Sequence, residues 1–528
     1  HISAEERAAA KQEKIEFEKQ SLGSIKAPHF SLAVKDYLVN RYGEDLIING
    51  GLKVITTLDW KIQEIGEKVI KEGADRNEKL YQGRNASLVA EDPKTGQILA
   101  LVGSRDYFNV ENEGNFNVAT QGLRQPGSAL KPFAYLTAFQ KGYSPKTYIF
   151  DVPTEFDTTG VPERSYQPGN FDNLFRGPVT LEEGLAQSIN IPAVKVLYLA
   201  GLDNFLKNIQ KFGVTTLKER WRYGLSLILG GGEVKLIELI NAYSILAEEG
   251  IRHEQTMILK VEDNSGKILE EYHDKAEKVI DAKYARLINQ ILSDKDLRSP
   301  LFQNSLSLTI FPERDVALKT GTTNDYRDAW AMGYTPSLAV GVWAGNNDNT
   351  PMKQQGGSIL AAVPIWSAFL KEVLDFYEPE AFTKPEPVNF INKPMLNGPS
   401  LSFPDPHNQS FPQIHSLLYY VDKNDPLGPL PQDPGEDAQF NNWEAGVINW
   451  ARTNLPNFYQ YNINSSPGSI NNFGLQNNGI KILNFSPTNG QFINSPILVK
   501  ADIQSGAEIE EIELYFNGRL MNNVRINN

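Results

Sequence analysis

The segment Pro126-Gly127-Ser128-Ala129-Leu130-Lys131-Pro132 carries most of the information in this chain, because it holds a serine and a lysine three residues apart between two prolines. Proline is tolerated around the start of a helix but not deep inside one, so the pattern predicts a helix that begins near Ser128. Residues at this spacing share one helix face, which brings the Lys131 amine within reach of the Ser128 hydroxyl. The segment therefore favours a serine nucleophile activated by a lysine.

A lysine acts as a general base only when its amine is neutral, and a free lysine has a pKa of roughly 10.4. The pKa of Lys131 must therefore be lowered for this chemistry to run near neutral pH. Burial lowers the pKa of a lysine, and so does a second positive charge nearby. We expect Lys319, far downstream, to supply that charge, so that the two lysines hold unlike protonation states.

A second motif, Ser188-Ile189-Asn190, lies between two predicted helices. Thr180 and Glu183 have the spacing of a capping box, which predicts a short helix that ends at about Ser188. Pro192 predicts the start of the next helix. The motif is then a tight loop that can direct two polar side chains, those of Ser188 and Asn190, into a cleft.

A third motif, Lys319-Thr320-Gly321-Thr322, precedes a predicted turn at 324–327. Two β-like runs follow at 329–334 and 338–344, so the motif is predicted to lie on a strand of an antiparallel hairpin. Two residues are interpreted as charges of the turn and are not assigned to the site; they are Arg327 and Asp328.

Alternation along this strand places the hydroxyls of Thr320 and Thr322 on one side. Gly321 has no side chain, and we interpret it as the point where a substrate backbone approaches the strand. Each motif alone has a simpler explanation. A serine at a helix start is usually a cap, Asn190 before Ile191-Pro192 could be a turn residue, and threonine is a common strand residue.

Two of the motifs also occur elsewhere in the chain. Lys94-Thr95-Gly96 lies between two apolar runs and is predicted to be a hairpin turn. Ser469-Ile470-Asn471 lies in a stretch rich in Asn, Ser and Gly and is predicted to be a solvated loop. The order and the setting of the three main motifs, rather than any one of them, indicate the chemistry.

Taken together, the motifs resemble those of the transpeptidase domain of class A penicillin-binding proteins. Residues 124–133 are close to that family's nucleophile segment, and residues 322–330 resemble its third-motif segment. Ile189 stands where β-lactamases usually carry Asp, which favours the penicillin-binding side. The resemblance covers roughly residues 20–375 and implies an α+β fold, with a central antiparallel sheet flanked by helices and the nucleophile helix beneath the cleft.

The resemblance also implies catalytic roles. Ser128 would attack the carbonyl between the two terminal D-alanines of a peptidoglycan stem peptide, with Lys131 taking its proton. Ser188, hydrogen-bonded to Lys131 and Lys319, would return a proton to the departing D-alanine. Asn190 would hold the peptide amide.

The same resemblance implies a binding strand. Lys319, Thr320 and Thr322 would bind the terminal carboxylate, and Gly321 completes the substrate-binding set. Backbone N–H groups of Ser128 and Thr322 would form the oxyanion hole. An amine from a second stem peptide would then resolve the acyl-enzyme into a cross-link, while a β-lactam would acylate the same serine and remain bound.

Other readings of the chemistry remain open at this point. A D,D-carboxypeptidase would pass the acyl group to water, and a non-catalytic β-lactam sensor would be acylated without forming product. A β-lactamase needs a deacylating base, and the sequence has no Glu-x-x-Leu-Asn segment.

Composition argues against several other classes. The six histidines have no zinc-ligand spacing and no visible serine triad, and no phosphate-binding loop occurs. A net charge of −13 without a basic run disfavours nucleic acid as a partner. We expect no cofactor and no metal. The expected partners are stem peptides and β-lactams, with cell-wall, divisome or elongasome proteins as further candidates.

The 528 residues suggest several domains. We expect residues 1–60 to hold the end of a glycosyltransferase region and a linker, and residues 61–378 to form the transpeptidase domain. Residues 379–475 are predicted to be a Pro/Asn-rich linker that contains one short helix near 445–453, and residues 476–528 a partial immunoglobulin-like β domain.

The chain begins at His1 within a charged helical pattern at 4–20, and we interpret it as a fragment. Its lack of cysteine suits the bacterial envelope. The resemblance implies an extracytoplasmic location, with a membrane anchor upstream in the full-length parent.

Overall fold

The computed structural model describes Ser3, residues 25–353, 355–387, 393–398 and 414–454, and four strands between 480 and 525. The predicted helical pattern at 4–20 and the loop at 469–471 lie outside these residues. The chain divides into two compact units, which we describe separately. The first comprises His1–Pro153, Gln167–Ser400 and Tyr419–Gln432, and the second comprises Thr154–Tyr166, Leu401–Leu418 and Asp433–Asn528.

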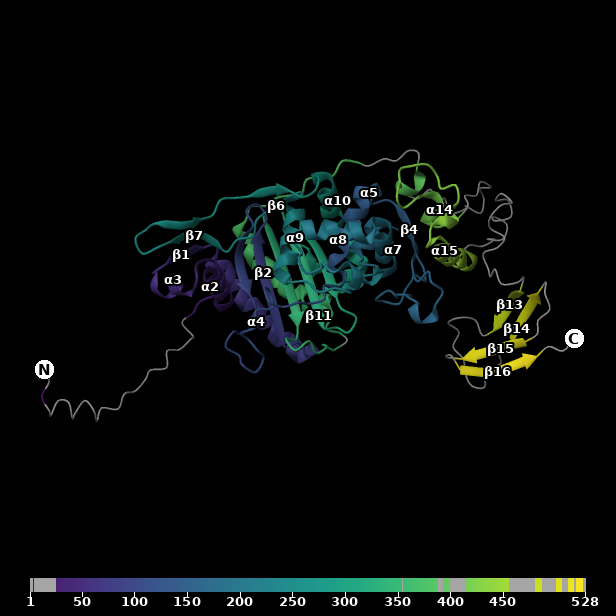
Figure 1. Cartoon of the computed structure of the whole chain (residues 1–528), viewed down its shortest axis with the longest axis horizontal. Coiled ribbons are helices and arrows are strands. Elements are labelled where there is room, and N and C mark those ends of the chain that lie inside the picture. The colour runs from purple at the N-terminus through teal and green to yellow at the C-terminus, as the bar shows by residue number, and fades with distance from the viewer. Residues whose placement is uncertain are drawn as a thin grey trace. The chain divides into compact units, whose positions relative to one another are not determined.

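A five-stranded antiparallel sheet forms the centre of the first unit, where Figure 1 labels β2 and β11. Its strands, in spatial order, are β10 (Ala317–Thr322), β11 (Asp328–Thr335), β12 (Leu338–Gly345), β2 (Asn85–Asp92) and β3 (Gln97–Val102). The predicted hairpins are confirmed, and Lys94-Thr95-Gly96 forms the turn between β2 and β3. The α+β fold with a central antiparallel sheet is therefore confirmed.

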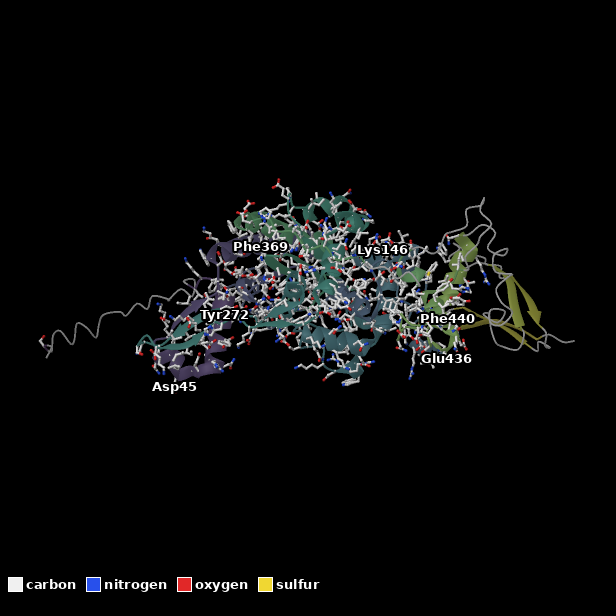
Figure 2. The ribbon with its side chains drawn as sticks, turned by 90° about the horizontal axis from the view of Figure 1, so that it is seen from above. Asp45, Lys146, Tyr272, Phe369, Glu436 and Phe440 are labelled. Carbon is white, nitrogen blue, oxygen red and sulfur yellow. The ribbon has the colours of Figure 1, made fainter. Side chains whose placement is uncertain are left out.

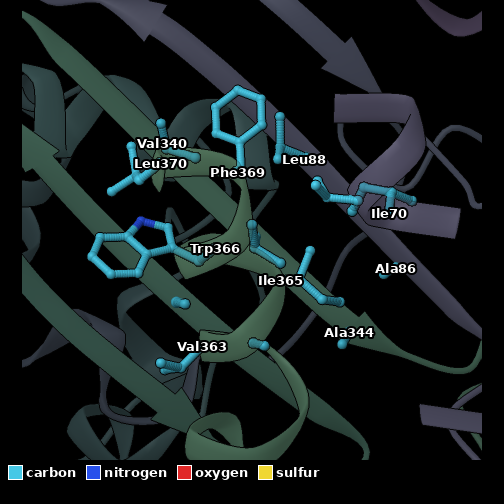
Figure 3. Packing of buried hydrophobic residues seen from close by; sticks show 14 of the residues in the cluster. Ile70, Ala86, Leu88, Val340, Ala344, Val363, Ile365, Trp366, Phe369 and Leu370 are labelled. Carbon is cyan, nitrogen blue, oxygen red and sulfur yellow. The ribbon is translucent and has the colours of Figure 1, made fainter. Parts of the chain in front are cut away.

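One face of this sheet is covered by α4 (Trp60–Tyr81) and α13 (Val363–Val373). Asp59 caps α4 by accepting hydrogen bonds from the N–H groups of Lys61 and Ile62. Figure 3 shows the resulting core, in which Trp366 and Phe369 of α13 pack with residues of the sheet such as Leu88. Burial of each such side chain stabilises the fold by about 1.5–3 kcal/mol.

Helix α9 (Leu236–Ala247) covers the opposite face. Its Asn241 donates a 3.1 Å hydrogen bond to Glu91, a buried residue of β2. The ring of Phe133 in α5 (Lys131–Lys141) meets Tyr243 of α9 edge-on, with centroids 5.3 Å apart. Helix α5 thus contacts α9, the helix that covers this face of the sheet, and the first residue of α5 is the predicted catalytic lysine.

Smaller elements complete the first unit. Figure 2 labels Phe369 in α13 and Tyr272, which follows β8 of a three-stranded sheet ordered β1-β7-β8. The further bounds are α2 Pro28–Tyr42, α3 Glu44–Asn49, β1 Lys53–Thr56, β4 Tyr148–Asp151, β5 Gly177–Thr180, α6 Leu181–Ala186, α7 Asn190–Ala200, α8 Leu202–Lys211, β6 Ile251–His253, β7 Ile258–Glu262, β8 Ile268–Glu271, β9 Ala276–Lys278, α10 Ala282–Ser293, α11 Lys295–Phe302 and α12 Ser358–Ala361. Helix α14 (Leu417–Tyr420) begins in the second unit and ends in the first.

In the second unit, α15 spans Phe440–Asn454 and begins earlier than the short helix predicted near 445–453. Trp443 and Val447 of α15 are buried, and Glu444 lies 2.6 Å from His415. The segment expected to be a linker therefore contains folded structure, because apolar residues recur at helical spacing along it.

Four strands follow as two antiparallel hairpins, β13 (Ile480–Ser486) with β14 (Lys500–Ser505) and β15 (Glu511–Phe516) with β16 (Arg519–Arg525). Strand β14 begins later than the strand predicted at 497–501. In the part of the chain that the structure describes, no helix combines the length and the apolar character needed to cross a bilayer.

Candidate active site

The predicted nucleophile lies in a short 3-10 helix, η2 (Gly127–Leu130), which leads directly into α5. Two hydrogen bonds from neighbouring elements hold this turn. The hydroxyl of Tyr243 donates to the carbonyl of Ala129 at 2.7 Å, and the indole N–H of Trp330 donates to the carbonyl of Gln125 at 2.8 Å. Ser128 is half-buried and lines a cleft, so the predicted helix start near Ser128 is confirmed in a tighter form.

Two glycines allow the nucleophile turn to approach β10. Gly127 has a φ of +53°, and a Cβ on it would lie 2.6 Å from the carbonyl oxygen of Thr322. A Cβ on Gly321 would lie 2.1 Å from the carbonyl oxygen of Pro126. The nucleophile turn therefore packs against the α-carbon of Gly321 on one face of β10, and the interpretation of Gly321 as the approach point for a substrate backbone along the strand stays a prediction.

Lys131 is completely buried, and its amine is held by the Ser188–Asn190 loop. Its Nζ donates to the carbonyls of Ser188 and Ile189 at 2.7 and 3.2 Å and to Asn190 Oδ1 at 2.9 Å. Burial, and then the charge of Lys319, lower the pKa of Lys131 well below its usual value, although the carboxylate of Asp151 opposes the shift. The direction is the one that a lysine base requires.

Lys319 lies on β10 and is also buried. Its Nζ donates to Ser188 Oγ and to the carbonyl of Thr320, both at 2.8 Å. Burial lowers the pKa of Lys319 to about 7. Because Lys131 Nζ lies 3.5 Å from the same Ser188 oxygen, the hydroxyl joins the two amines. The structure thus brings all three motifs together.

Ser188 adopts an unusual backbone conformation, with a φ of 58°. It follows α6 as the left-handed residue of a Schellman motif: its N–H donates to the carbonyl of Leu185 at 3.1 Å, and the N–H of Ile189 donates to Gly184 at 2.9 Å. Glycine usually occupies this position, and a side chain there costs about 1 kcal/mol or more. A strained serine beside two lysines is typical of a residue needed for chemistry.

Asn190 is positioned by a residue that the sequence analysis missed. Asn170 Oδ1 accepts hydrogen bonds from the N–H groups of Asn190 and Ile191 at 3.0 and 3.3 Å, and so caps α7 from outside. Asn170 Nδ2 donates to the buried carboxylate of Asp151 at 2.7 Å. Only the fold brings these residues together, and no local pattern in the sequence signals the contact.

The two threonines of β10 line the cleft, as the strand alternation predicts. The hydroxyl of Thr322 donates to Ser358 Oγ at 2.9 Å and accepts from the N–H of Ser358 at 2.9 Å. Ser358 belongs to α12, and it is a second cleft residue that the sequence analysis missed.

Asp328 is buried rather than part of an exposed turn, so its interpretation as a turn charge is wrong. Its carboxylate accepts a 2.8 Å hydrogen bond from the indole N–H of Trp343. Burial raises the pKa of Asp328 to about 6, against the hydrogen bond from Trp343 and the charge of Arg124. The carboxylate lies beneath the nucleophile segment, since the backbone of Gln125 also donates to it.

The resulting cleft has a volume of about 550 Å³. It is lined by polar groups that include Ser128, Ser188, Asn190, Thr320 and Thr322, and by apolar side chains such as Phe171, Leu301 and Tyr326. Among the described residues, no group of three or more histidine, aspartate or glutamate side chains is placed to hold a metal ion. Two coupled lysines, a serine turn and a polar strand edge are what serine acyl transfer requires.

Comparison with known sequences agrees with this geometry. Residues 86–371 match the penicillin binding protein transpeptidase domain. Penicillin-binding protein 2D of Bacillus subtilis is 34% identical over 366 residues, which are 68% of this chain and 51% of that protein. Penicillin-binding protein 1A of Aquifex aeolicus is 29% identical over 445 residues, which are 69% and 59% respectively. The chain thus spans about half the length of the curated relatives it matches.

Solved structures show the same fold. Penicillin-binding protein 1A of Haemophilus influenzae superposes with a TM-score of 0.61 at 23% identity, over 73% of this chain and 75% of that one. PonA1 of Mycobacterium tuberculosis in complex with penicillin V gives a TM-score of 0.59 at 25% identity, over 69% and 97%. Because the family match covers more than half of the sequence and contains all three motifs, the chain belongs to the penicillin-binding protein transpeptidase family.

Proposed function

We propose that residues 61–378 form a peptidoglycan D,D-transpeptidase that works through an acyl-enzyme on Ser128. The observation that carries the proposal is the position of Ser188 Oγ, which lies 2.8 Å from Lys319 Nζ and 3.5 Å from Lys131 Nζ beside the nucleophile turn. This arrangement supplies a proton acceptor and a proton donor without histidine.

In the acylation step, neutral Lys131 takes the proton of Ser128 while Oγ attacks the carbonyl carbon of the D-Ala-D-Ala bond. The N–H groups of Ser128 and Thr322 stabilise the oxyanion. The close approach of Gly127 to the backbone of Thr322 supports this role, because it brings the two peptide units side by side.

The C–N bond then breaks, and Ser188 passes its proton to the nitrogen of the departing D-alanine. Ser188 recovers a proton from the Lys131 ammonium, which returns to the neutral state. Asn190 holds the stem-peptide amide. An acceptor amine attacks the ester carbonyl, transfers its proton by the same route in reverse, and releases the cross-linked product with Ser128 restored.

β-Lactams enter the same scheme, with the ring amide in place of the scissile peptide bond. The PonA1 structure contains penicillin V, which supports β-lactam binding by this chain. We place the activity on the outer side of the bacterial membrane, where peptidoglycan lies. Cell-wall, divisome or elongasome partners, and an immunoglobulin-like class for 476–528, belong to the same proposal; the two C-terminal hairpins support the latter.

The first test is incubation with a labelled penicillin, followed by intact-mass analysis and peptide mapping. Wild type should carry one stable adduct on Ser128, and Ser128→Ala should carry none. Ser305→Ala removes a different hydroxyl from the lining of the same cleft and should be labelled like wild type. An adduct that persists on Ser128→Ala, or rapid release of hydrolysed drug, would overturn the assignment.

A second test separates transfer from hydrolysis. A donor peptide that ends in D-Ala-D-Ala is incubated with increasing concentrations of an amine acceptor, and both products are quantified. The proposal predicts that the cross-linked product rises with acceptor while free acid falls. Hydrolysis alone at every concentration would indicate a D,D-carboxypeptidase, and labelling without either product would indicate a sensor.

A further inference from the structure

The hydroxyls of Thr322 and Ser358 form a closed pair at the edge of the cleft. Thr322 Oγ1 accepts the N–H of Ser358 and donates to Ser358 Oγ, both at 2.9 Å. The resemblance assigns carboxylate binding to three residues of β10, namely Lys319, Thr320 and Thr322. In this structure, Thr322 cannot act independently of Ser358, because each hydroxyl is engaged with the other residue.

The number of hydroxyl protons shows that the Thr322–Ser358 pair can still donate one hydrogen bond. The two hydroxyls carry two protons, and one of them is used between the two oxygens. Within the described residues, neither side chain has another hydrogen-bond partner, so one O–H group remains free to donate. Both residues line the cleft, and Ser358 is only 5% exposed, so the free donor faces the ligand space in a nearly dry setting.

Ser358 is held rigidly in this position. It opens α12, and the far end of that short helix is fixed by α4: Asn77 donates to the carbonyl of Ala361 at 3.0 Å, and Arg76 donates to the carbonyl of Leu360 at 2.7 Å. A donor fixed in advance costs little to order when a ligand binds.

The surroundings favour an anionic ligand group. Thr320 lies two residues before Thr322 on β10, and so directs its side chain to the same face of the strand. The carbonyl of Thr320 accepts a hydrogen bond from the Lys319 amine. Hydroxyl donors bind a carboxylate about twice as strongly as a neutral carbonyl, and a nearby cation adds to that preference.

We propose that Ser358 is a carboxylate-binding residue of this cleft, which acts with Thr322 as one donor unit and selects acyl donors that carry a free terminal carboxylate. The inference rests on the proposed function. It adds a residue from α12, outside the three motifs, to the recognition of the D-alanine carboxylate and of the corresponding carboxylate of penicillins.

The test compares acylation by a penicillin with acylation by its methyl ester, which keeps the reactive ring but lacks the charge. The second-order rate constant for each is measured by intact mass on wild type and on Ser358→Ala. The variant should lose roughly tenfold in the ratio of acid to ester rates, while the ester rate stays within about twofold of wild type.

Two further variants make the result decisive. Ser305→Ala removes another cleft hydroxyl, one that does not contact Thr322, and should leave the ratio unchanged. Ser358→Cys keeps the size of the side chain but donates weakly, and should shift the ratio in the same direction as Ser358→Ala.

An unchanged ratio, or an equal fall of both rates in Ser358→Ala and Ser358→Cys, would overturn the inference while leaving the proposed function intact. A wild type that takes up no label on Ser128 would overturn the proposed function itself.

Discussion

The Lys319 amine donates a 2.8 Å hydrogen bond to the hydroxyl of Ser188. Lys131 Nζ lies 3.5 Å from the same oxygen, so one hydroxyl connects two buried lysines. Two ammonium groups this close in a dry site repel each other, and the state with a single charge is favoured near neutral pH. Their protonation is therefore coupled, with Ser188 as the bridge along which a proton can pass.

The coupling predicts how acylation depends on pH. Lys131 must be neutral to accept the Ser128 proton, and its pKa is lowered by burial and by Lys319. The rate of penicillin acylation should therefore rise with pH and level off well below the usual lysine pKa of about 10.4. Lys319→Met removes the second charge, so the rising limb should move to higher pH.

Lys94→Met is a matched control, because it alters the lysine of the other Lys-Thr-Gly sequence, in the exposed hairpin turn. Its profile should coincide with that of wild type. The coupling is refuted if Lys319→Met leaves the limb in place or moves it to lower pH.

The backbone strain at Ser188 predicts that two substitutions there have the same effect on activity but different effects on stability. Ser188→Gly and Ser188→Ala both remove the hydroxyl, so both should abolish turnover. They differ at a residue whose φ is 58°, where glycine is unstrained and alanine is not. The glycine variant should be more stable than the alanine variant by about 1 kcal/mol, or about 2 °C in the midpoint of the first thermal transition.

Differential scanning calorimetry of the two variants checks this prediction, because the lost hydrogen bonds cancel in the comparison. Equal midpoints, or a more stable alanine variant, would mean that the left-handed conformation at Ser188 carries no cost.

The sequence predicted the site better where one element determines the geometry than where two elements meet. The prolines around Ser128 correctly predict the start of a helical turn there, and the capping box at Thr180 correctly places the loop that follows α6. Strand alternation predicts which face of β10 lies at Gly321, but it does not predict which residue packs against that face. That group is the turn at Pro126, which is far away in the sequence.

The residues missed by the sequence analysis share this cause. Asn170 and Ser358 contact motif residues that are distant in the chain, and neither has a local pattern that distinguishes it from a loop residue. The sequence predicts Asp328 as a charge of the hairpin turn, whereas it is the first residue of β11 and is buried. The apolar spacing in α15 was present in the sequence, but it was outweighed by the Pro- and Asn-rich composition around it.

The buried carboxyl of Asp328 predicts a pH-dependent stability. Its folded pKa of about 6 lies above the ordinary value of 3.8, so the folded state binds more protons than the unfolded state between these values. Stability contributed by this group is complete at low pH and is lost as pH rises through the window. The loss amounts to about 3 kcal/mol by pH 7.

Asp328→Asn cannot ionise, so its stability relative to wild type should increase between pH 4 and pH 7. Asp325→Asn changes an exposed carboxyl in the turn that precedes β11 and should show no such trend. Denaturant unfolding at several pH values measures the difference. A constant gap between Asp328→Asn and wild type across the window would show that the carboxyl does not titrate there.

The close approach at Gly321 makes the final prediction. A methyl group there would lie 2.1 Å from the carbonyl oxygen of Pro126, so Gly321→Ala must push the nucleophile turn away from β10. We expect a loss of about 1–3 kcal/mol in stability. We also expect acylation of Ser128 to slow by roughly 10²-fold, because Ser128 and the N–H of Thr322 no longer face one reacting carbonyl. Gly357→Ala is the matched control, since its methyl group would lie 3.6 Å from Thr322 Oγ1, an ordinary contact. If the two variants acylate at equal rates, the packing of the nucleophile turn against Gly321 does not position Ser128.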